Sequence, residues 1–447
     1  MEKEGNTINE LADVYKETEI KSSLNVISSE TKKEDINVNS AYDKITGNYW
    51  YNNKSLWLML RTICFIIILL VFLGLIFNFE YNSVKTSTIF WFFLIPLMVV
   101  IIYFVPMLWR NICPLATTHL FNFNFFHKRR LSKEGVKANI LSGVRSTAYK
   151  FLIKNGVLIS ALLFWIIVPM RLFLFNKNDF LTLILLLIIF LTALIMGFLF
   201  PVKSGWCTSI CPVFSAEKTY GINPMLYIRN QRCDYYNEQL KKVNSCSGCS
   251  FNCIDVNEPE ACYFMESCSR PFHDNINALM RKIFISTFPG FVLGYMFFTD
   301  GFNLFVKSLN FEILIALKDT FSTNLLLKYS AISIFMGITF LIYNLIKYLF
   351  RRFIKEQLTL DKPNRTYSLY KRRLDLSFIL ISFNLFWIGS SYAMIFYVFS
   401  PIFKLSNDLS LNLFSVLFFT IFTLSIVGLI KGWNETFIQG EHNPSWW

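Results

Sequence analysis

Long apolar runs separated by polar, basic segments form the main pattern of this chain. About eight of these runs approach the roughly 20 residues that a helix needs to cross the hydrocarbon core of a bilayer. The pattern therefore predicts an all-α integral membrane bundle of about eight transmembrane helices. We expect the spans over residues 57–78, 87–109, 153–175, 179–200, 282–299, 328–350, 376–400 and 411–432.

A ninth apolar segment, 302–318, differs from these runs. It carries Lys307, Asn310 and Glu312, which predicts an interfacial helix rather than a span. Charged side chains are nearly absent from the spans, and Arg61 lies close enough to a span end to reach the interface. A proton pump or an ion-coupled transporter needs more carboxylates within the membrane, so this class is not expected.

The charges between the runs predict the orientation. The segments after the second, fourth and sixth spans are rich in Lys and Arg, and the alternate segments are short and poor in them. With eight spans all three basic segments fall on one side, which the positive-inside rule makes cytoplasmic. We expect a multi-pass protein of the inner or cytoplasmic membrane with both termini in the cytoplasm.

Composition adds a division into four parts. Residues 1–50 are polar and are expected to form a disordered cytoplasmic tail. Residues 51–203 form a four-span core of two hairpins, 204–280 a cytoplasmic Cys-rich segment, and 281–447 a four-span part with a basic cytoplasmic loop. The net charge of +13 comes with no basic stripe on a soluble module, so nucleic acid is not an expected partner.

Nine of the ten cysteines lie on the expected cytoplasmic side, where thiols stay reduced. Metal binding is therefore favoured over disulfides. The spacing C-x2-C-x3-C at Cys246, Cys249 and Cys253 brings thiolates together on one centre. Cys64 lies within the first span and is expected to be a packing residue. The other candidate metal ligands are Cys113, Cys207, Cys211, Cys233, Cys262 and Cys268.

Two cytoplasmic helix exits are alike. The second span is followed by Ile112-Cys113-Pro114, and the fourth by Ile210-Cys211-Pro212. This likeness indicates a duplicated helical hairpin, which would bring Cys113 to the same membrane level as Cys207 and Cys211. The three cysteines would be neighbours only if the two hairpins pack against each other.

A resemblance to a known family rests on these residues. Gly205-Trp206-Cys207-x3-Cys211-Pro212, followed by a basic stretch and a ferredoxin-like Cys loop, resembles the NapH/NosR-type membrane iron–sulfur proteins, which are polyferredoxin-like and bind 4Fe-4S clusters. The resemblance covers about residues 57–300. It implies a cytoplasmic ferredoxin-like insertion that holds a [4Fe–4S] cluster and takes part in membrane-bound electron transfer.

The resemblance also implies a ligand set. Cys246, Cys249 and Cys253 would be three ligands, and the Cys-Pro cysteine Cys211, or Cys207, the fourth. A second cluster would use the remaining loop cysteines, with Cys113 as a further candidate. Trp109 and Val243 stand where the family has cysteines, so this second cluster is left open.

We expect the protein to pass electrons between a cytoplasmic carrier or the quinol pool and a partner redox system. A basic group in the loop favours an acidic partner such as a flavodoxin or ferredoxin, and a partner reductase is also open. The group is Arg229, Arg232, Lys241 and Lys242. The segment Leu120–Phe126 either binds a quinone head group or forms an amphipathic interfacial helix.

Two other readings of the same residues stay open. Zinc also takes four thiolates, so the chain is alternatively a membrane permease or scaffold with a structural zinc-binding loop. A third reading is an enzyme that uses the cluster as a subunit of a membrane reductase. No span contains a histidine, so a haem held by two histidines inside the bilayer is not expected. His119 and His127 are expected at the surface.

Overall fold

The computed structural model describes residues 54–119, 142–199, 204–207, 210–221, 232–237, 242–247, 275–299, 319–322, 324–357 and 363–438. Six helices in these residues are long and apolar enough to cross a membrane, which confirms the multi-pass class. They are Ser55–Ile76, Thr86–Phe104, Asp179–Leu199, Leu325–Phe350, Arg373–Phe403 and Asn407–Lys431. The expected tail 1–50, the interfacial segment 302–318 and the segment Leu120–Phe126 lie outside the described residues.

The third and fifth predicted spans are helical, but their apolar segments are shorter. These segments, Leu158–Phe173 and Lys282–Phe297, lie within the helices α9 (Ser142–Phe173) and α14 (Asn275–Phe297). A count of eight spans therefore remains a prediction.

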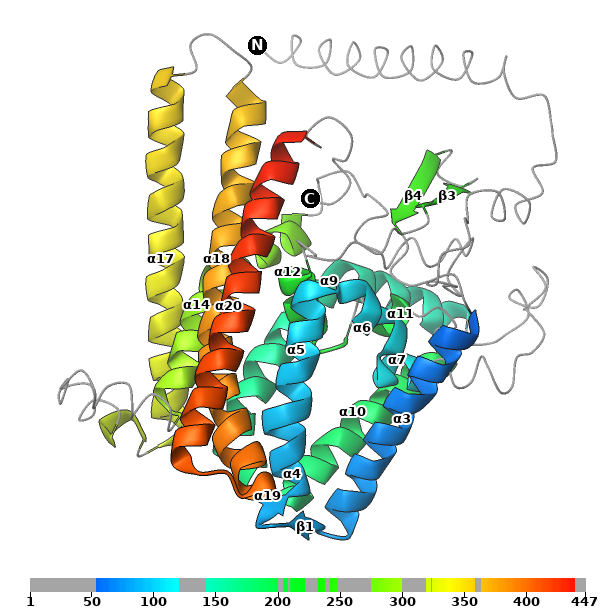
Figure 1. Cartoon of the computed structure of the whole chain (residues 1–447). Coiled ribbons are helices and arrows are strands. Elements are labelled where there is room, and N and C mark those ends of the chain that lie inside the picture. The colour runs from blue at the N-terminus through cyan, green and yellow to red at the C-terminus, as the bar shows by residue number, and fades with distance from the viewer. Residues whose placement is uncertain are drawn as a thin grey trace, which may run out of the picture. The chain divides into compact units, whose positions relative to one another are not determined.

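The first hairpin ends in two short helices that each begin with a proline. After α3 (Lys54–Ile76) the chain turns through β1 (Glu80–Tyr81) and β2 (Val84–Lys85) and returns through α4 (Thr86–Ile89), the π-helix η2 (Phe90–Leu94) and α5 (Ile95–Phe104) (Figure 1). Pro106 begins α6 (Pro106–Ile112), and Pro114 begins α7 (Pro114–His119). Proline suits the first turn of a helix because the amide it lacks would have no partner there.

The second hairpin leads into the Cys-rich segment. It consists of α9, the short 3-10 helix η4 (Phe175–Lys177) and α10 (Asp179–Leu199), followed by α11 (Ser204–Cys207) and α12 (Phe214–Tyr220). Pro169 lies inside α9. The strands β3 (Arg232–Asn237) and β4 (Lys242–Ser247) then pair antiparallel, with Cys233 directly opposite Cys246.

The described residues are mostly helical, which confirms the predicted helical class. Two short two-stranded sheets, β1–β2 and β3–β4, accompany the helices. The described residues of the Cys-rich segment form two short helices and the β3–β4 strand pair. They do not show the ferredoxin-like insertion.

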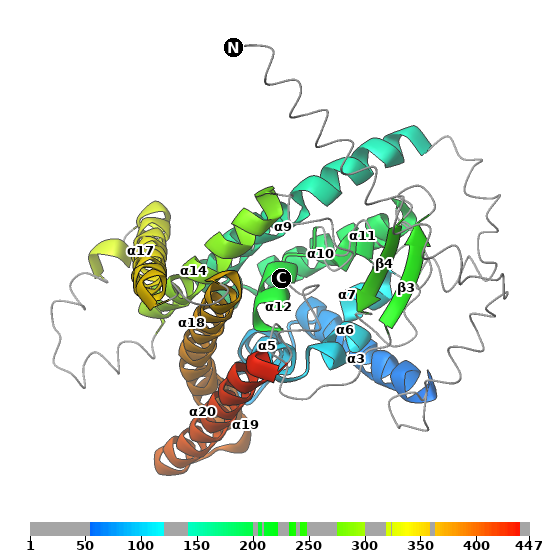
Figure 2. The same cartoon turned by 90° about the horizontal axis from the view of Figure 1, so that it is seen from above.

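The C-terminal part is a group of long helices. It contains α14, α17 (Leu325–Gln357), α18 (Pro363–Met394), the π-helix η5 (Ile395–Phe399), α19 (Ser400–Phe403) and α20 (Asn407–Ile438). Helix α14 packs against α9, α17 and α18, and α18 packs against α20. Figures 1 and 2 show α17, α18 and α20 side by side. Helix α14 thus joins this group to the two N-terminal hairpins.

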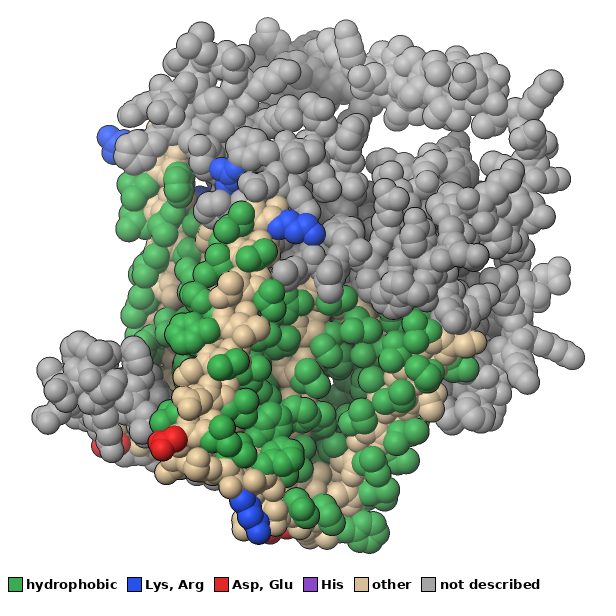
Figure 3. All heavy atoms as spheres, in the orientation of Figure 1, with side chains coloured by type: hydrophobic (Ala, Val, Ile, Leu, Met, Phe, Trp, Pro, Cys, Tyr) green, Lys and Arg blue, Asp and Glu red, His purple; other side chains and the backbone are tan. Residues whose placement is uncertain are grey.

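Aromatic side chains fill the centre of the bundle. The rings of Tyr103 on α5 and Phe383 on α18 stack with their centroids 3.8 Å apart. Phe284, Phe288 and Phe291 recur on one face of α14 and surround Phe164 of α9. The outer faces of the described helices are also largely apolar (Figure 3). This distribution suits a bundle whose surroundings are lipid rather than water.

Two glycines allow α14 and α17 to approach closely. Gly290 and Gly294 have the small-xxx-small spacing that recurs where membrane helices touch. A Cβ added at Gly290 would lie 2.2 Å from the backbone oxygen of Phe335, and one at Gly294 would lie 2.8 Å from Cα of Ile332. The contact between these helices is therefore backbone against backbone.

Candidate functional site

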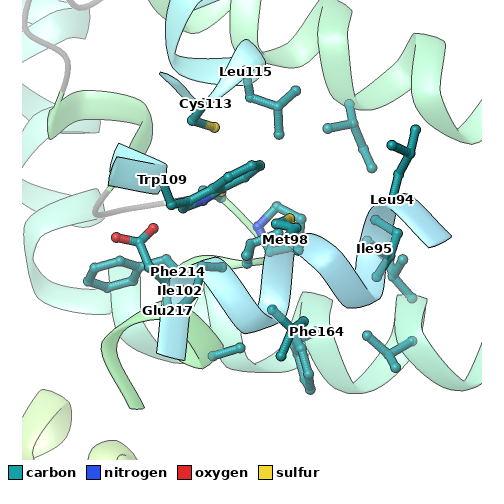
Figure 4. Close-up of a pocket in the computed structure, with 18 of the residues that line it drawn as sticks. Leu94, Ile95, Met98, Ile102, Trp109, Cys113, Leu115, Phe164, Phe214 and Glu217 are labelled. Carbon is teal, nitrogen blue, oxygen red and sulfur yellow. The ribbon is translucent and has the colours of Figure 1, made fainter. Parts of the chain in front are cut away.

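A cavity of about 390 Å³ lies within the bundle, among helices of the two N-terminal hairpins and α14. This volume is within the range of pockets that bind small molecules. Most of its wall is apolar, with Leu94, Ile95, Met98, Ile102 and Phe164 along it (Figure 4).

Three candidate cysteine ligands line this same cavity. Cys113 stands between α6 and α7, Cys207 ends α11, and Cys211 begins the turn to α12. Figure 4 shows Cys113 near Trp109, with Glu217 on the same side of the cavity. The two Ile-Cys-Pro exits therefore meet at one wall, and the hairpins that carry them pack against each other.

Hydrogen bonds from α9 and α12 fix the Cys211-Pro212 turn. The hydroxyl of Ser160 donates to the Cys211 carbonyl at 2.8 Å, and the backbone amide of Phe214 donates to the same oxygen at 3.0 Å. The amide of Ser215 in turn donates to the Ser160 hydroxyl at 3.1 Å. Ser160 is fully buried, so it ties the turn to the interior of the bundle.

The surroundings of Cys211 disfavour its thiolate. Burial, and then the neighbouring charge of a Cys113 thiolate, raise the pKa of Cys211 well above the usual value for a thiol. A metal ion reverses this preference because a coordinating thiol is deprotonated. The raised pKa therefore argues against Cys211 as a free nucleophile, and a metal ion would have to bind in place of its proton.

Trp206 provides a test of whether these residues fit an iron–sulfur group. Its side chain is buried, and its indole N–H has no hydrogen-bond partner within the part of the chain that the structure describes. It precedes Cys207 and lines the same cavity. Donors close to cluster sulfurs tune the reduction potential, so a buried N–H beside Cys207 fits a thiolate-bound cluster.

The other predicted ligands are only partly visible. Cys233 and Cys246 oppose each other in the β3–β4 register, which the spacing of the cysteines did not reveal. Cys249, Cys253, Cys262 and Cys268 lie outside the described residues. Among the residues that are described, no three His, Cys, Asp or Glu side chains form a group that could hold a metal ion.

Two further residues singled out from the sequence, His119 and Cys64, lie in the described part of the chain. His119, expected at the surface, is buried, with Nδ1 3.3 Å from the carbonyl oxygen of Ala193. The expectation was wrong because α7 packs directly on α10: a Cβ added at Gly197 would lie 2.1 Å from the His119 oxygen. Cys64 lies in α3 as expected, is half-buried and also lines the cavity. His127 lies outside the described residues.

Arg171 is the residue that the sequence interpretation missed. It lies in α9 within the third predicted span, is 6% exposed and lines the cavity. Its Nη2 donates to the Trp91 carbonyl at 2.5 Å, its Nε donates to Asn176 Oδ1 at 3.3 Å, and its guanidinium lies 5.1 Å from the centroid of the Trp91 ring. Arg171 lies two residues before the end of the apolar segment Leu158–Phe173, and an ionisable residue inside a span is a functional signal, so its place in the sequence was itself a signal.

The π-helix η2 explains the bond between Arg171 and Trp91. The amide of Ile95, which would donate to the Trp91 carbonyl in a regular α-helix, donates instead to the carbonyl of Phe90, five residues earlier. The residue after it is Pro96, which has no amide to offer to the Trp91 carbonyl. Arg171 supplies the missing donor from a different hairpin, and π-turns of this kind occur often at functional sites.

Comparison of the chain with protein-family models, with curated proteins and with solved structures finds no match.

Proposed function

We propose that the chain is a membrane-bound electron-transfer protein whose cysteine thiolates hold an iron–sulfur group at the cytoplasmic end of the bundle. The observation that carries the proposal is that Cys113, Cys207 and Cys211 all line one cavity. Cys113 follows the first hairpin, whereas Cys207 and Cys211 follow the second, and free thiols have no packing requirement that would place them at a common cavity. Convergent thiolates on the reducing side of a membrane are typical of metal-bound electron carriers.

The proposed ligand set combines the two parts of the site. Cys246, Cys249 and Cys253 would supply three thiolates, and Cys207 or Cys211 the fourth, to one [4Fe–4S] cluster. A second cluster, which would draw on Cys113, Cys233, Cys262 and Cys268, stays open. When bound, the cluster would supply one-electron chemistry, while Trp206 and the buried turn at Cys211 would tune its potential.

The electron source would be either a cytoplasmic carrier or the quinol pool. The basic residues of the Cys-rich segment favour an acidic soluble carrier, because opposite charges speed encounter. The apolar cavity offers volume for a quinol beside the cysteines. From either source the electrons would pass to a partner redox system.

Anaerobic purification with iron, acid-labile sulfide and zinc analysis tests the proposal. We expect a brown protein with broad visible absorption that dithionite bleaches, and iron and sulfide in equal amounts. Colourless protein with stoichiometric zinc would overturn the proposal and support the permease or scaffold alternative.

A matched pair of variants tests the ligands. Cys249→Ser should abolish the bound iron, because three thiolates no longer complete the cluster. Cys64→Ser, at a cysteine within a span, should retain it. Equal loss of iron in both variants would contradict the division between ligand and span cysteines.

A further inference from the structure

We infer that the cavity binds an amphiphile with an anionic oxygen group, held by Arg171, and an apolar chain that extends towards the cysteine wall. The shared chemistry is a carboxylate or phosphate joined to a hydrocarbon chain, as in a fatty acid or an anionic phospholipid. This inference does not depend on the proposed electron-transfer function.

The charge of Arg171 is not neutralised within the described residues. None of their carboxylates forms an ion pair with it, although it is 6% exposed and lies inside a predicted span. An arginine buried in a membrane helix is usually paired or faces a cavity. The three aromatic rings around the guanidinium, those of Trp91, Phe92 and Tyr295, contribute cation–π contacts but no counter-charge.

Arg171 also has N–H groups that its two hydrogen-bond acceptors do not use. A guanidinium has five N–H groups, and Trp91 and Asn176 accept one each. The remaining three have no acceptor among the residues that the structure describes, and Arg171 lines the cavity. Two N–H groups of a guanidinium can hold a carboxylate or phosphate side by side, and such bonds are about twice as strong as neutral ones.

The shape and charge of the cavity set the orientation of the ligand. Arg171 and Glu217 are its two charged lining residues in the described chain. Arg171 lies eleven residues beyond Ser160 along α9, which places it roughly 16 Å from the level of the Cys211 turn. An anion is attracted to Arg171 and repelled by Glu217, while the apolar wall between them accepts the chain.

Binding of radiolabelled palmitate to the full-length protein in a neutral detergent tests the inference. We expect saturable binding that Arg171→Gln weakens by at least about tenfold, the loss expected for a charge-assisted hydrogen bond. Palmityl alcohol, which has the same chain without the charge, should compete poorly. Dipalmitoyl phosphatidate should compete too, and its strength relative to unlabelled palmitate tells whether a phospholipid or a fatty acid is preferred.

Two more variants keep the test decisive if Arg171→Gln does not fold. Arg171→Lys keeps the positive charge and should bind palmitate more tightly than Arg171→Gln. If Arg171→Gln does not fold, the palmitate affinity of Arg171→Lys should lie within about tenfold of the wild-type affinity. Met98→Trp occupies part of the cavity from a lining residue other than Arg171 and should lower palmitate binding at least as strongly as Arg171→Gln. Undetectable palmitate binding to the wild type, equal affinity in Met98→Trp, or equal competition by palmityl alcohol would overturn the inference.

The two proposals fail separately. Cys249→Ser removes the expected cluster but leaves Arg171 and the cavity wall intact, so palmitate affinity should be unchanged in that variant. Loss of iron together with unchanged palmitate binding fits both proposals. Absence of iron from the wild type refutes the cluster alone.

Discussion

The contact between α14 and α17 allows a sharp prediction for Gly290→Ala. The new Cβ would lie 2.2 Å from the Phe335 carbonyl oxygen and 2.4 Å from the Thr339 hydroxyl. A side chain could rotate away from the methyl group, but the carbonyl oxygen is part of the helix backbone. The two helices would therefore have to separate by about 1 Å to restore a normal contact distance.

Two effects of opposite sign set the magnitude. Overpacking of a close contact typically costs about 1–3 kcal/mol. Alanine favours the helix over glycine by about 0.8–1.0 kcal/mol, which offsets part of this cost. We therefore expect Gly290→Ala to lower the free energy of unfolding by up to about 2 kcal/mol, and to be about 1–3 kcal/mol less stable than a variant that gains only the helix propensity of alanine.

The measurement is equilibrium unfolding in mixed micelles, followed by tryptophan fluorescence. Gly337→Ala on α17 is the matched control, because a Cβ there meets nothing within 4 Å. The control should be neutral or slightly more stable than the wild type. Gly290→Ala as stable as Gly337→Ala would refute the reasoning, since both variants would then report helix propensity alone.

Three further predictions concern single side chains. Tyr343→Phe should destabilise the protein by about 1.5–3 kcal/mol, because the buried Tyr343 hydroxyl donates to Asp375 Oδ1 at 2.5 Å. The control Tyr348→Phe, at an exposed site, should leave the stability unchanged. Equal unfolding curves for the two variants would contradict this prediction. Ser160→Ala should cost about 1–3 kcal/mol in the same unfolding assay, and no change would show that the Cys211 turn does not need that hydroxyl. In metal-free protein at pH 8, iodoacetamide should alkylate Cys113 before Cys211, since the raised pKa of Cys211 keeps it protonated well above that pH; faster modification of Cys211 by mass spectrometry would reverse the assignment.

The sequence predicted the membrane class because a span leaves a signal that depends on length and composition alone. It also singled out the two Ile-Cys-Pro exits. Whether Cys113 and Cys211 meet depended on how the hairpins pack, which the helical periodicity of the spans does not encode. Their shared wall became visible only in three dimensions.

Other features were missed for identifiable reasons. His119 ends the second of two short proline-initiated helices, and no sequence pattern indicates that such a segment folds back onto α10. Arg171 could have been found, since an ionisable residue inside a span is a functional signal by itself. The pairing of Cys233 with Cys246 required a strand register, which the ferredoxin-like spacing does not suggest.

The bond between Arg171 and Trp91 has a consequence for biosynthesis. The second predicted span enters the bilayer with a carbonyl that its own helix cannot satisfy, and the third enters with a buried cation. An unsatisfied carbonyl costs several kcal/mol in hydrocarbon, and the bond satisfies it while giving the guanidinium one of its acceptors. Trp91 and Arg171 are 80 residues apart in the sequence, and the bond between them can form only when both segments are in the membrane. The two segments are therefore expected to leave the translocation machinery together. A ribosome-bound chain truncated before Arg171 would hold its second span less securely in the membrane.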